Sequence, residues 1–219
     1  PEAAIIGEYD KVHLVPFGEY LPAWIEKLLP FARNLTEAAG NFSPGEKTRL
    51  LTIEGTPFGT FICYEAIFPD LVRRFVKEGA KFLVNITNDA WFGPTSAPYQ
   101  HLDMVAMRAV ENKVFVARAA NTGVTALIEP TGRVRQATRI FEPAWITDEV
   151  VFLSMGTLYS RIGDLFAWIA LGISLFLPAA AGIRSWRRHR IRHGSDAAPP
   201  RIPRSSSLDR RGEVEKRDA

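Results

Sequence analysis

Residues 59–86 read Gly59-Thr-Phe-Ile-Cys-Tyr-Glu-Ala-Ile-Phe-Pro-Asp-Leu-Val-Arg-Arg-Phe-Val-Lys-Glu-Gly-Ala-Lys-Phe-Leu-Val-Asn-Ile86. Residues 59–63 are a short run rich in strand-forming types. Pro69 then suits the first position of a helix, and apolar residues recur at helical spacing until Gly79. Residues 82–86 have the composition of a buried strand. Strands that alternate with helices in this way favour a layered α/β body.

The flanking segments continue the same alternation. Upstream, Leu50–Ile53 is a short strand, and the turn-forming residues 54–57 separate it from the strand at 59–63. Downstream, an apolar helical face is followed by a strand at 114–118 and a hairpin across residues 124–134. That helical face comprises Leu102, Val105, Ala106, Ala109 and Val110. We therefore expect residues 1–153 to form a mixed α/β domain.

The sharpest change in composition is the stretch 165–183, whose 19 residues carry no charge. As a helix it would span roughly 28 Å, close to the hydrocarbon thickness of a bilayer. A buried core helix is the alternative, but arginines crowd the end of the stretch, and Trp168 and Trp186 lie near its two ends. The pattern predicts a transmembrane helix at 165–183, reached through a juxtamembrane linker at 154–164.

The residues after this helix are strongly basic. From residue 184 to the end there are 11 Lys or Arg against 5 Asp or Glu, whereas the preceding 183 residues hold 16 against 19. The positive-inside bias places the basic segment 184–219 in the cytoplasm and residues 1–160 on the opposite side. Its later part has too few apolar residues to fold, so we expect a disordered tail. A mildly acidic body argues against nucleic acid as a partner.

Cys63 is the single cysteine of the chain, which excludes an internal disulfide and a cysteine zinc site. It lies where the strand at 59–63 passes into the next helix. A thiol at such a turn is exposed at the sheet edge, where nearby helix N–H groups favour the reactive thiolate. A lone cysteine is otherwise a small buried hydrophobe, so its neighbours must decide between these interpretations.

Three other features carry chemistry. Lys11 lies in a segment dense in polar groups, where it can stabilise a thiolate or a tetrahedral oxyanion, although a solvated lysine is the ordinary alternative. His13 and His101 are too far apart in sequence to indicate a metal pair and are interpreted as structural histidines. The loop 88–93 follows a buried strand and either closes over a substrate or simply ends the strand.

The same segments resemble a known family. Lys11 within Tyr-x-Lys-x-His-Leu, Cys63 within Ile-Cys-Tyr-Glu and the later Asn-Asp-Ala-Trp-Phe-Gly motif are similar to the nitrilase, or carbon–nitrogen hydrolase, superfamily. The segment 13–20 and the following apolar helix narrow the resemblance to the apolipoprotein N-acyltransferases. The similarity covers roughly residues 5–183 and implies the C-terminal portion of an α-β-β-α sandwich, followed by one transmembrane helix and the tail.

The resemblance also implies the roles of individual residues. It makes Cys63 the nucleophile of a Glu–Lys–Cys triad, Lys11 the oxyanion-stabilising cation and Glu19 an additional active-site glutamate. The implied substrate-binding residues are Tyr64 and Glu65 beside the nucleophile and Trp91 and Phe92 near the lipid entrance. The family's general-base glutamate lies well upstream of the lysine, and neither Glu2 nor Glu8 matches its position. We therefore expect this stretch to be a fragment that cannot catalyse the reaction alone.

The implied reaction is a ping-pong acyl transfer without metal or cofactor. A phospholipid donates its acyl chain to Cys63, and the thioester passes it to the α-amine of a diacylglyceryl apolipoprotein. The implied location is the bacterial inner (plasma) membrane, with a multi-pass full-length protein, the catalytic domain on the periplasmic face and the C-terminus in the cytoplasm.

Two other interpretations use the same residues differently. A membrane-anchored carbon–nitrogen hydrolase, such as an amidase, would use the cysteine with water as acceptor, but the segment 15–19 and the outward placement disfavour it. A non-catalytic, membrane-tethered binding domain would have a degenerate site, whereas Lys11, Glu19 and Cys63 are all present.

Overall fold

The structure is a computed structural model that describes residues 5, 7–22, 25, 27, 42–154 and 156–194, the last ten of these by their backbone alone. The part of the predicted tail after Gly194 lies outside these residues. The chain divides into two units, Pro1–Phe166 and Ala167–Ala219.

The first unit is built on one mixed sheet whose strands lie side by side in sequence order. They are β1 (Leu50–Ile53), β2 (Thr56–Ile62), β3 (Leu83–Asn88), β4 (Val116–Asn121), β5 (Ala126–Ile128) and β6 (Val134–Ala137). The central strands β2, β3 and β4 are parallel, and the outer pairings are antiparallel. Each parallel step is bridged by a helix, α3 (Pro69–Lys77) and then α4 (Ala97–Asn112). The predicted strand–helix alternation and the C-terminal hairpin are confirmed.

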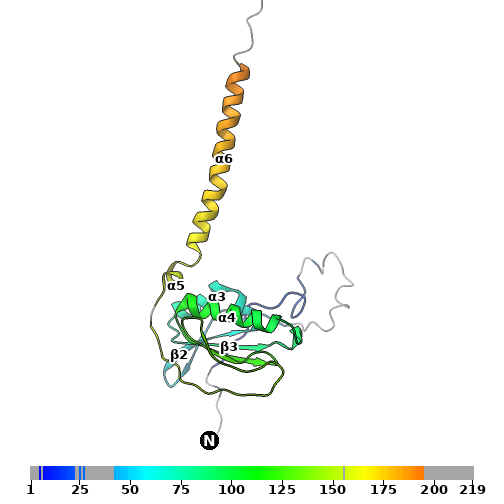
Figure 1. Cartoon of the computed structure of the whole chain (residues 1–219), viewed down its shortest axis with the longest axis vertical. Helices are drawn as coiled ribbons and strands as arrows, with labels where there is room; N and C mark the ends of the chain where they lie inside the picture. The colour runs from blue at the N-terminus through cyan, green and yellow to red at the C-terminus, as the bar shows by residue number, and fades with distance from the viewer. Residues whose placement is uncertain are drawn as a thin grey trace, which may run out of the picture. The chain divides into compact units, whose positions relative to one another are not determined.

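Both bridging helices cover the same face of the sheet (Figure 1). The burial of the strand residues agrees with this, because successive side chains of a strand point to opposite faces of the sheet. In β3, Leu83 and Asn85 are wholly buried while Ile86 is 43% exposed. The buried positions meet the apolar face of α3, where Phe75 is wholly buried. The described residues thus supply one sheet and one helix layer, which is half of the layering expected of an α-β-β-α sandwich.

The parallel arrangement brings three loops to one edge of the sheet. β2, β3 and β4 end at Ile62, Asn88 and Asn121, and parallel strands have their carboxyl ends on the same side. Cys63 follows the first of these strands, and Asp89 follows the second. Residues separated along the chain are therefore gathered at one edge, where open α/β sheets bind their ligands.

The expected linker 154–164 contains a short helix, α5 (Leu158–Ile162). The Thr157 hydroxyl caps it by accepting a 2.8 Å hydrogen bond from the Ser160 N–H. The helix packs against α3 and α4, and Ser160 is buried. This part of the linker therefore belongs to the folded body.

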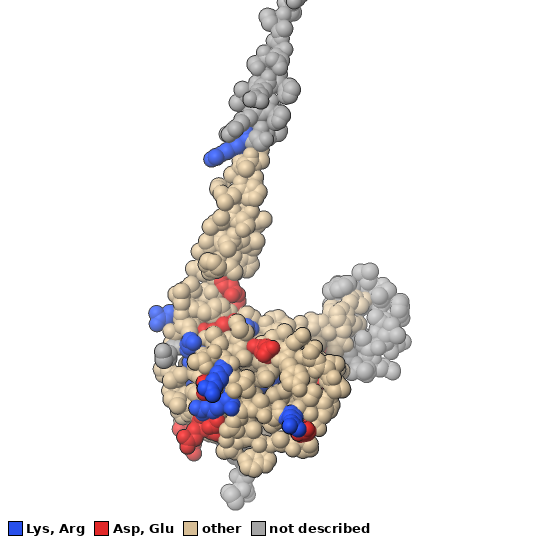
Figure 2. Space-filling model, in the orientation of Figure 1, with Lys and Arg blue, Asp and Glu red and all other residues tan. Residues whose placement is uncertain are grey.

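The second unit consists mainly of α6 (Leu165–Gly194), which contains Pro178. Its 20 residues Leu165–Arg184 are long and apolar enough to cross a membrane, and none of them is buried. Figure 2 shows no charged side chain along this stretch before its basic end. The helix runs further than expected, since residues 184–194 are helical rather than part of a disordered tail. Arginine is a strong helix former, and no glycine or proline interrupts the segment before Gly194.

Candidate active site

Cys63 occupies a strained turn at the carboxyl end of β2. It is the first residue of the 3-10 helix η1 (Cys63–Ile67) and has a φ of 49°. A non-glycine residue in this left-handed region is uncommon, and such strain persists only where surrounding contacts hold it. The thiol is partly exposed and lines a cavity, so it is not a sealed core residue.

Glu65 provides many of the contacts that hold this turn. Its wholly buried carboxylate accepts hydrogen bonds from the main-chain N–H groups of Ile62 and Val12, both at 2.7 Å, and His13 at 3.1 Å. The Tyr9 hydroxyl donates a fourth at 2.9 Å. Burial and the Glu65 carboxylate raise the pKa of Tyr9 above its ordinary value, which keeps this donor neutral. One carboxylate thus joins the turn at Cys63 to the segment that carries Lys11.

Lys11 is paired with Glu19. Its Nζ lies 2.7 Å from both carboxylate oxygens, and the N–H of Val15 donates to Glu19 Oε2 at 2.7 Å. The Lys11 and Glu19 side chains are only 10% and 24% exposed. An ammonium has three N–H donors, and Glu19 engages two of them, which leaves one for a further acceptor. The pair is therefore a fixed, charged group with remaining donor capacity.

A cavity of about 450 Å³ opens at this edge of the sheet. Glu19, Cys63, Tyr64, Trp91, Phe92 and His101 are among the residues that line it. Most of the remaining wall is apolar, with Val15, Ile67 and Met104 among its side chains. Trp91 is 71% exposed and belongs to a single 3-10 turn, η2 (Ala90–Phe92), that follows β3. The site is therefore a largely apolar chamber with one thiol and one glutamate in its wall.

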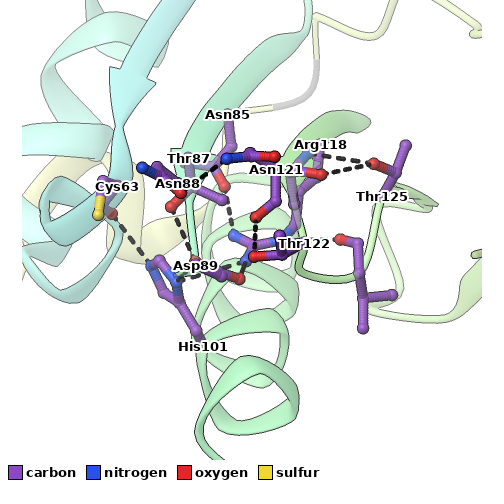
Figure 3. A network of polar contacts seen from close by, with 12 residues as sticks. Cys63, Asn85, Thr87, Asn88, Asp89, His101, Arg118, Asn121, Thr122 and Thr125 are labelled. Atoms are coloured by element: carbon purple, nitrogen blue, oxygen red, sulfur yellow. Dashed lines mark hydrogen bonds and ion pairs between the residues drawn. The ribbon is translucent and has the colours of Figure 1, made fainter. Parts of the chain in front are cut away.

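A buried polar network lies beneath Cys63 (Figure 3). His101, on α4, places Nε2 3.1 Å from the main-chain oxygen of Cys63 and Nδ1 2.9 Å from Asp89 Oδ1. Arg118, on β4, donates to Asp89 Oδ2 at 2.6 Å and to Asn85 Oδ1 at 2.5 Å. The side chains of Asp89 and Arg118 have no exposed surface.

The environment shifts the pKa values of both charged members. Burial opposes ionisation of Asp89, but the hydrogen bond from His101 and the charges of Arg118 and His101 together hold its pKa below the ordinary value. Burial lowers the pKa of Arg118, and the adjacent Asp89 carboxylate opposes that shift. The pair is thus ionised on both sides, and each charge compensates the other's desolvation.

Residues 1–150 match the sequence profile of the family described as carbon-nitrogen hydrolase. The chain belongs to the carbon–nitrogen hydrolase family. Its similarity to curated relatives extends further along the sequence. It is 46% identical to the apolipoprotein N-acyltransferase of Geobacter metallireducens over 193 residues, which are 88% of this chain and 36% of that protein.

Other curated relatives with the same name are also similar to this chain. The apolipoprotein N-acyltransferase of Bradyrhizobium diazoefficiens is 37% identical, over 86% of this chain and 35% of its own. The chain therefore spans about a third of the length of the curated relatives it matches. Among solved structures, an amidase of the nitrilase superfamily from Nesterenkonia sp. AN1 is 26% identical with a TM-score of 0.44, covering 62% of this chain and 47% of the amidase.

In this carbon–nitrogen hydrolase domain, most of the residues singled out from the sequence meet at the cavity. Cys63, Glu19, Tyr64 and the pair Trp91 and Phe92 all line it, and Lys11 is attached through Glu19. Glu65 is the exception, because its buried carboxylate is occupied by four protein donors. Its place among the substrate-binding residues stays a prediction, and its geometry is that of a residue that holds the turn.

Sequence reasoning missed the polar network below Cys63. It treated His101 as a structural histidine and Asp89 as part of a loop, and it assigned no role to Arg118. A signal was present, because Asn85 and Arg118 each lie two positions after a buried apolar residue of their strand, Leu83 and Val116, and so face inward. Polar groups at such positions are buried only when they are hydrogen-bonded, so they indicate a network even before its partners are known.

Replacing Glu65 with glutamine tests its role in holding the turn. Glutamine replaces one of the two accepting oxygens with an NH₂ group, which then faces at least the N–H donor of Ile62, so the free energy of unfolding should fall by roughly 2–3 kcal/mol. Chemical denaturation of the detergent-solubilised protein measures the change. The control is Glu78→Gln, which alters an exposed carboxylate with one long contact to Thr48 and should cost less than about 0.5 kcal/mol. Equal effects of the two substitutions would contradict the assignment.

Replacing Asp89 with asparagine tests the buried ion pair and its pH dependence. Breaking the pair should lower the free energy of unfolding by about 3–5 kcal/mol near neutral pH. Because the pKa of Asp89 is lowered in the folded state from 3.8, its stabilisation is present above that value and is lost as the pH falls through the folded pKa. The free energies of unfolding of the wild type and of Asp89→Asn, measured between about pH 6 and pH 2, should therefore become similar in acid. A difference in the free energy of unfolding that stays constant over that range would contradict a stabilising ion pair at Asp89.

Proposed function

We propose that this chain is the C-terminal catalytic part of an apolipoprotein N-acyltransferase. It would carry a fatty acyl chain as a thioester on Cys63 from a membrane phospholipid to the α-amine of a lipidated N-terminal cysteine. The observation that carries the proposal is the largely apolar cavity with the Cys63 thiol in its wall. Such a chamber suits a hydrocarbon chain, and its apolar wall disfavours water that would hydrolyse the thioester.

The first half-reaction forms the acyl-enzyme. A general base takes the proton of Cys63, and Sγ attacks the ester carbonyl of the phospholipid. The resulting oxyanion is stabilised by the remaining donor of Lys11, which Glu19 holds in place. The carbon–oxygen bond of the ester then breaks, and the lysophospholipid alkoxide leaves with the proton. The acyl carbon is now bonded to sulfur.

The second half-reaction transfers the chain. The free α-amine of the acceptor attacks the thioester carbonyl, and the same cation stabilises the new oxyanion. The carbon–sulfur bond breaks, the amide forms and the proton lost by the amine restores the Cys63 thiol. A thioester suits this order of events because an ester can form it and an amine still reacts with it.

The general base is proposed to be a glutamate upstream of this chain. Two glutamates near the thiol are already engaged, because Glu19 is bound to Lys11 and Glu65 accepts four hydrogen bonds. Because both carboxylates are held by other donors, we assign neither of them as the base. This stretch alone is therefore expected to be inactive, and activity requires the full-length enzyme.

The apolar helix supports a membrane location. Leu165–Arg184 can cross a bilayer, and the arginine-rich residues after it favour the cytoplasmic side. We therefore place the catalytic domain on the periplasmic face of the bacterial inner membrane, with the C-terminus in the cytoplasm. Its proposed partners are a phospholipid donor and a diacylglyceryl apolipoprotein acceptor.

The test is to trap the acyl-enzyme. The full-length enzyme is incubated with a phospholipid that carries a labelled acyl chain, and the peptide containing Cys63 is analysed by mass spectrometry. We expect the label on Cys63, its release by hydroxylamine and its transfer to a synthetic diacylglyceryl lipopeptide. Absence of label together with turnover of a small amide would instead support the amidase alternative.

A further inference from the structure

We propose that His101 is a positioning residue for acyl transfer, which holds the main-chain carbonyl of Cys63 and thereby fixes the geometry of the nucleophile. The proposal rests on the proposed function for its activity measurement. Its structural basis is independent and lies in the contacts beneath the thiol.

The contact between His101 and Cys63 has only one chemical interpretation. A main-chain carbonyl oxygen can only accept a hydrogen bond, so His101 Nε2, at 3.1 Å, is the donor in this contact. The His101 ring is 5% exposed, so water competes little for this bond. A ring from α4 is thus bonded to the backbone of the residue that would carry the acyl chain.

His101 is itself held from the far side. Asp89 Oδ1 lies 2.9 Å from His101 Nδ1 and also accepts a 2.9 Å hydrogen bond from the Thr87 hydroxyl. Arg118 anchors the other oxygen of Asp89 and reaches back to Asn85. Figure 3 shows this chain of contacts ending at Cys63. It ties β4, β3 and α4 to the turn after β2.

The held carbonyl controls more than one atom of the site. A peptide unit is planar and trans, so the carbonyl of Cys63 and the N–H of Tyr64 point in opposite directions. Fixing the carbonyl therefore fixes where that N–H points and restricts the direction of the Cys63 side chain. Cys63 also needs such support because its φ of 49° is unfavourable for a non-glycine residue.

The position of the network argues that it serves the nucleophile and not the core alone. A buried ion pair contributes little net stability, and apolar residues of similar volume often replace one without loss. The pair of Asp89 and Arg118 nevertheless lies directly behind the His101 ring, which is hydrogen-bonded to the main chain of Cys63. Phe92, in the cavity wall, packs edge-on to that ring with centroids 5.9 Å apart.

Two substitutions that differ by one methylene separate the two bonds of His101. In His101→Gln the side-chain amide reaches the position of Nε2 and can donate to the Cys63 carbonyl. In His101→Asn it reaches only the position of Nδ1 and keeps the contact with Asp89. The control is Asp103→Asn, which changes an exposed carboxylate on the same helix.

The variants are compared in the full-length enzyme by kcat and KM for acyl transfer from phospholipid. We expect His101→Asn to lower kcat by roughly 100-fold, the order of effect that a 1 Å misplacement causes, with KM within about 2-fold of the wild type. His101→Gln should stay within about 5-fold of the wild-type kcat, the equivalent of one weakened hydrogen bond. Asp103→Asn should leave both constants unchanged. Equal losses in His101→Asn and His101→Gln, no loss in either, or a change in KM alone would overturn the proposal.

A second measurement does not depend on the proposed function. The rate at which iodoacetamide alkylates Cys63, followed by mass spectrometry, should fall in His101→Asn and recover in His101→Gln. If acyl transfer is absent from the wild type, this pattern still supports the positioning role while the proposed function fails. If the wild type transfers acyl chains but neither kcat nor the rate of Cys63 alkylation changes in the variants, only the positioning role fails.

A milder variant covers the case in which both His101 variants unfold. Thr87→Val keeps the side-chain shape and removes only the hydroxyl that donates to Asp89. We expect a kcat lowered by about 3- to 5-fold with KM unchanged, as befits the loss of one hydrogen bond in the supporting chain. An unchanged kcat in this variant would overturn the proposal.

Discussion

Cys63→Ala in the full-length enzyme is expected to abolish labelling by acyl-phospholipid and to reduce acyl transfer by roughly 10⁴- to 10⁶-fold. Alanine removes the sulfur to which the acyl chain would be bonded, while the small side chain fits the same turn. Quantitative mass spectrometry of the acceptor lipopeptide and of the peptide around residue 63 measures both effects. Circular dichroism and thermal unfolding should match the wild type, because Cys63 joins the polar network through its main-chain oxygen, which alanine retains.

Cys63→Ser sharpens the same test. Serine keeps the shape of the side chain and can form an ester in place of a thioester, but it is a far weaker nucleophile without strong activation. We expect this variant to be almost as inactive as Cys63→Ala. If either variant left acylation of lipoproteins in cells unchanged, a non-catalytic, membrane-tethered domain would become the better interpretation.

Lys11→Met should lower the rate of acyl-enzyme formation by roughly 10²- to 10³-fold, the effect of losing one donor to a developing oxyanion. Methionine matches the length of the side chain but has neither charge nor N–H group. The rate is followed as labelled acyl chain appearing on Cys63 in a single turnover. Lys77→Met, an exposed lysine of α3, is the control and should leave the rate unchanged.

The double variant Lys11→Met with Glu19→Gln distinguishes two causes of lost activity. One is the loss of the Lys11 cation, and the other is the unpaired charge left on Glu19. Removing Lys11 alone leaves the partly buried carboxylate of Glu19 without its cation. If that unpaired charge caused the loss, the double variant would regain most of the activity. We expect no recovery, because neither replacement side chain can supply the positive charge. Recovery would assign Lys11 a structural role.

The fold around Cys63 could be predicted because its pattern is local. The alternation of β2, α3 and β3 is encoded in residues 56–88, where strand-forming runs surround one helical period. Boundaries were displaced by a few residues, as for β4, expected at 114–118 and found at Val116–Asn121. Hydrogen bonds to the neighbouring strand set those ends, and the register of a partner strand cannot be read from one segment alone.

The end of α6 illustrates a different limit. The apolar run predicted the helix, but its composition changes abruptly at Arg184. The change from apolar residues to arginines marks the end of the apolar stretch but not the end of the helix. Helix propensity continues through the arginines to Gly194, because polarity and helicity are separate properties of a residue.

Residue types and their spacing were enough to predict the α/β alternation, the apolar helix and the motifs around Lys11, Cys63 and Trp91 that mark the family. These are properties of residue type and near-neighbour spacing, which need no knowledge of distant contacts. The tertiary structure was needed to show that the Glu65 carboxylate is buried and accepts hydrogen bonds from four protein donors. It alone also brought His101, Asp89 and Arg118 together beneath the thiol. A side chain's role depends on which donors and acceptors surround it, and parallel strands collect those partners from loops far apart in the chain.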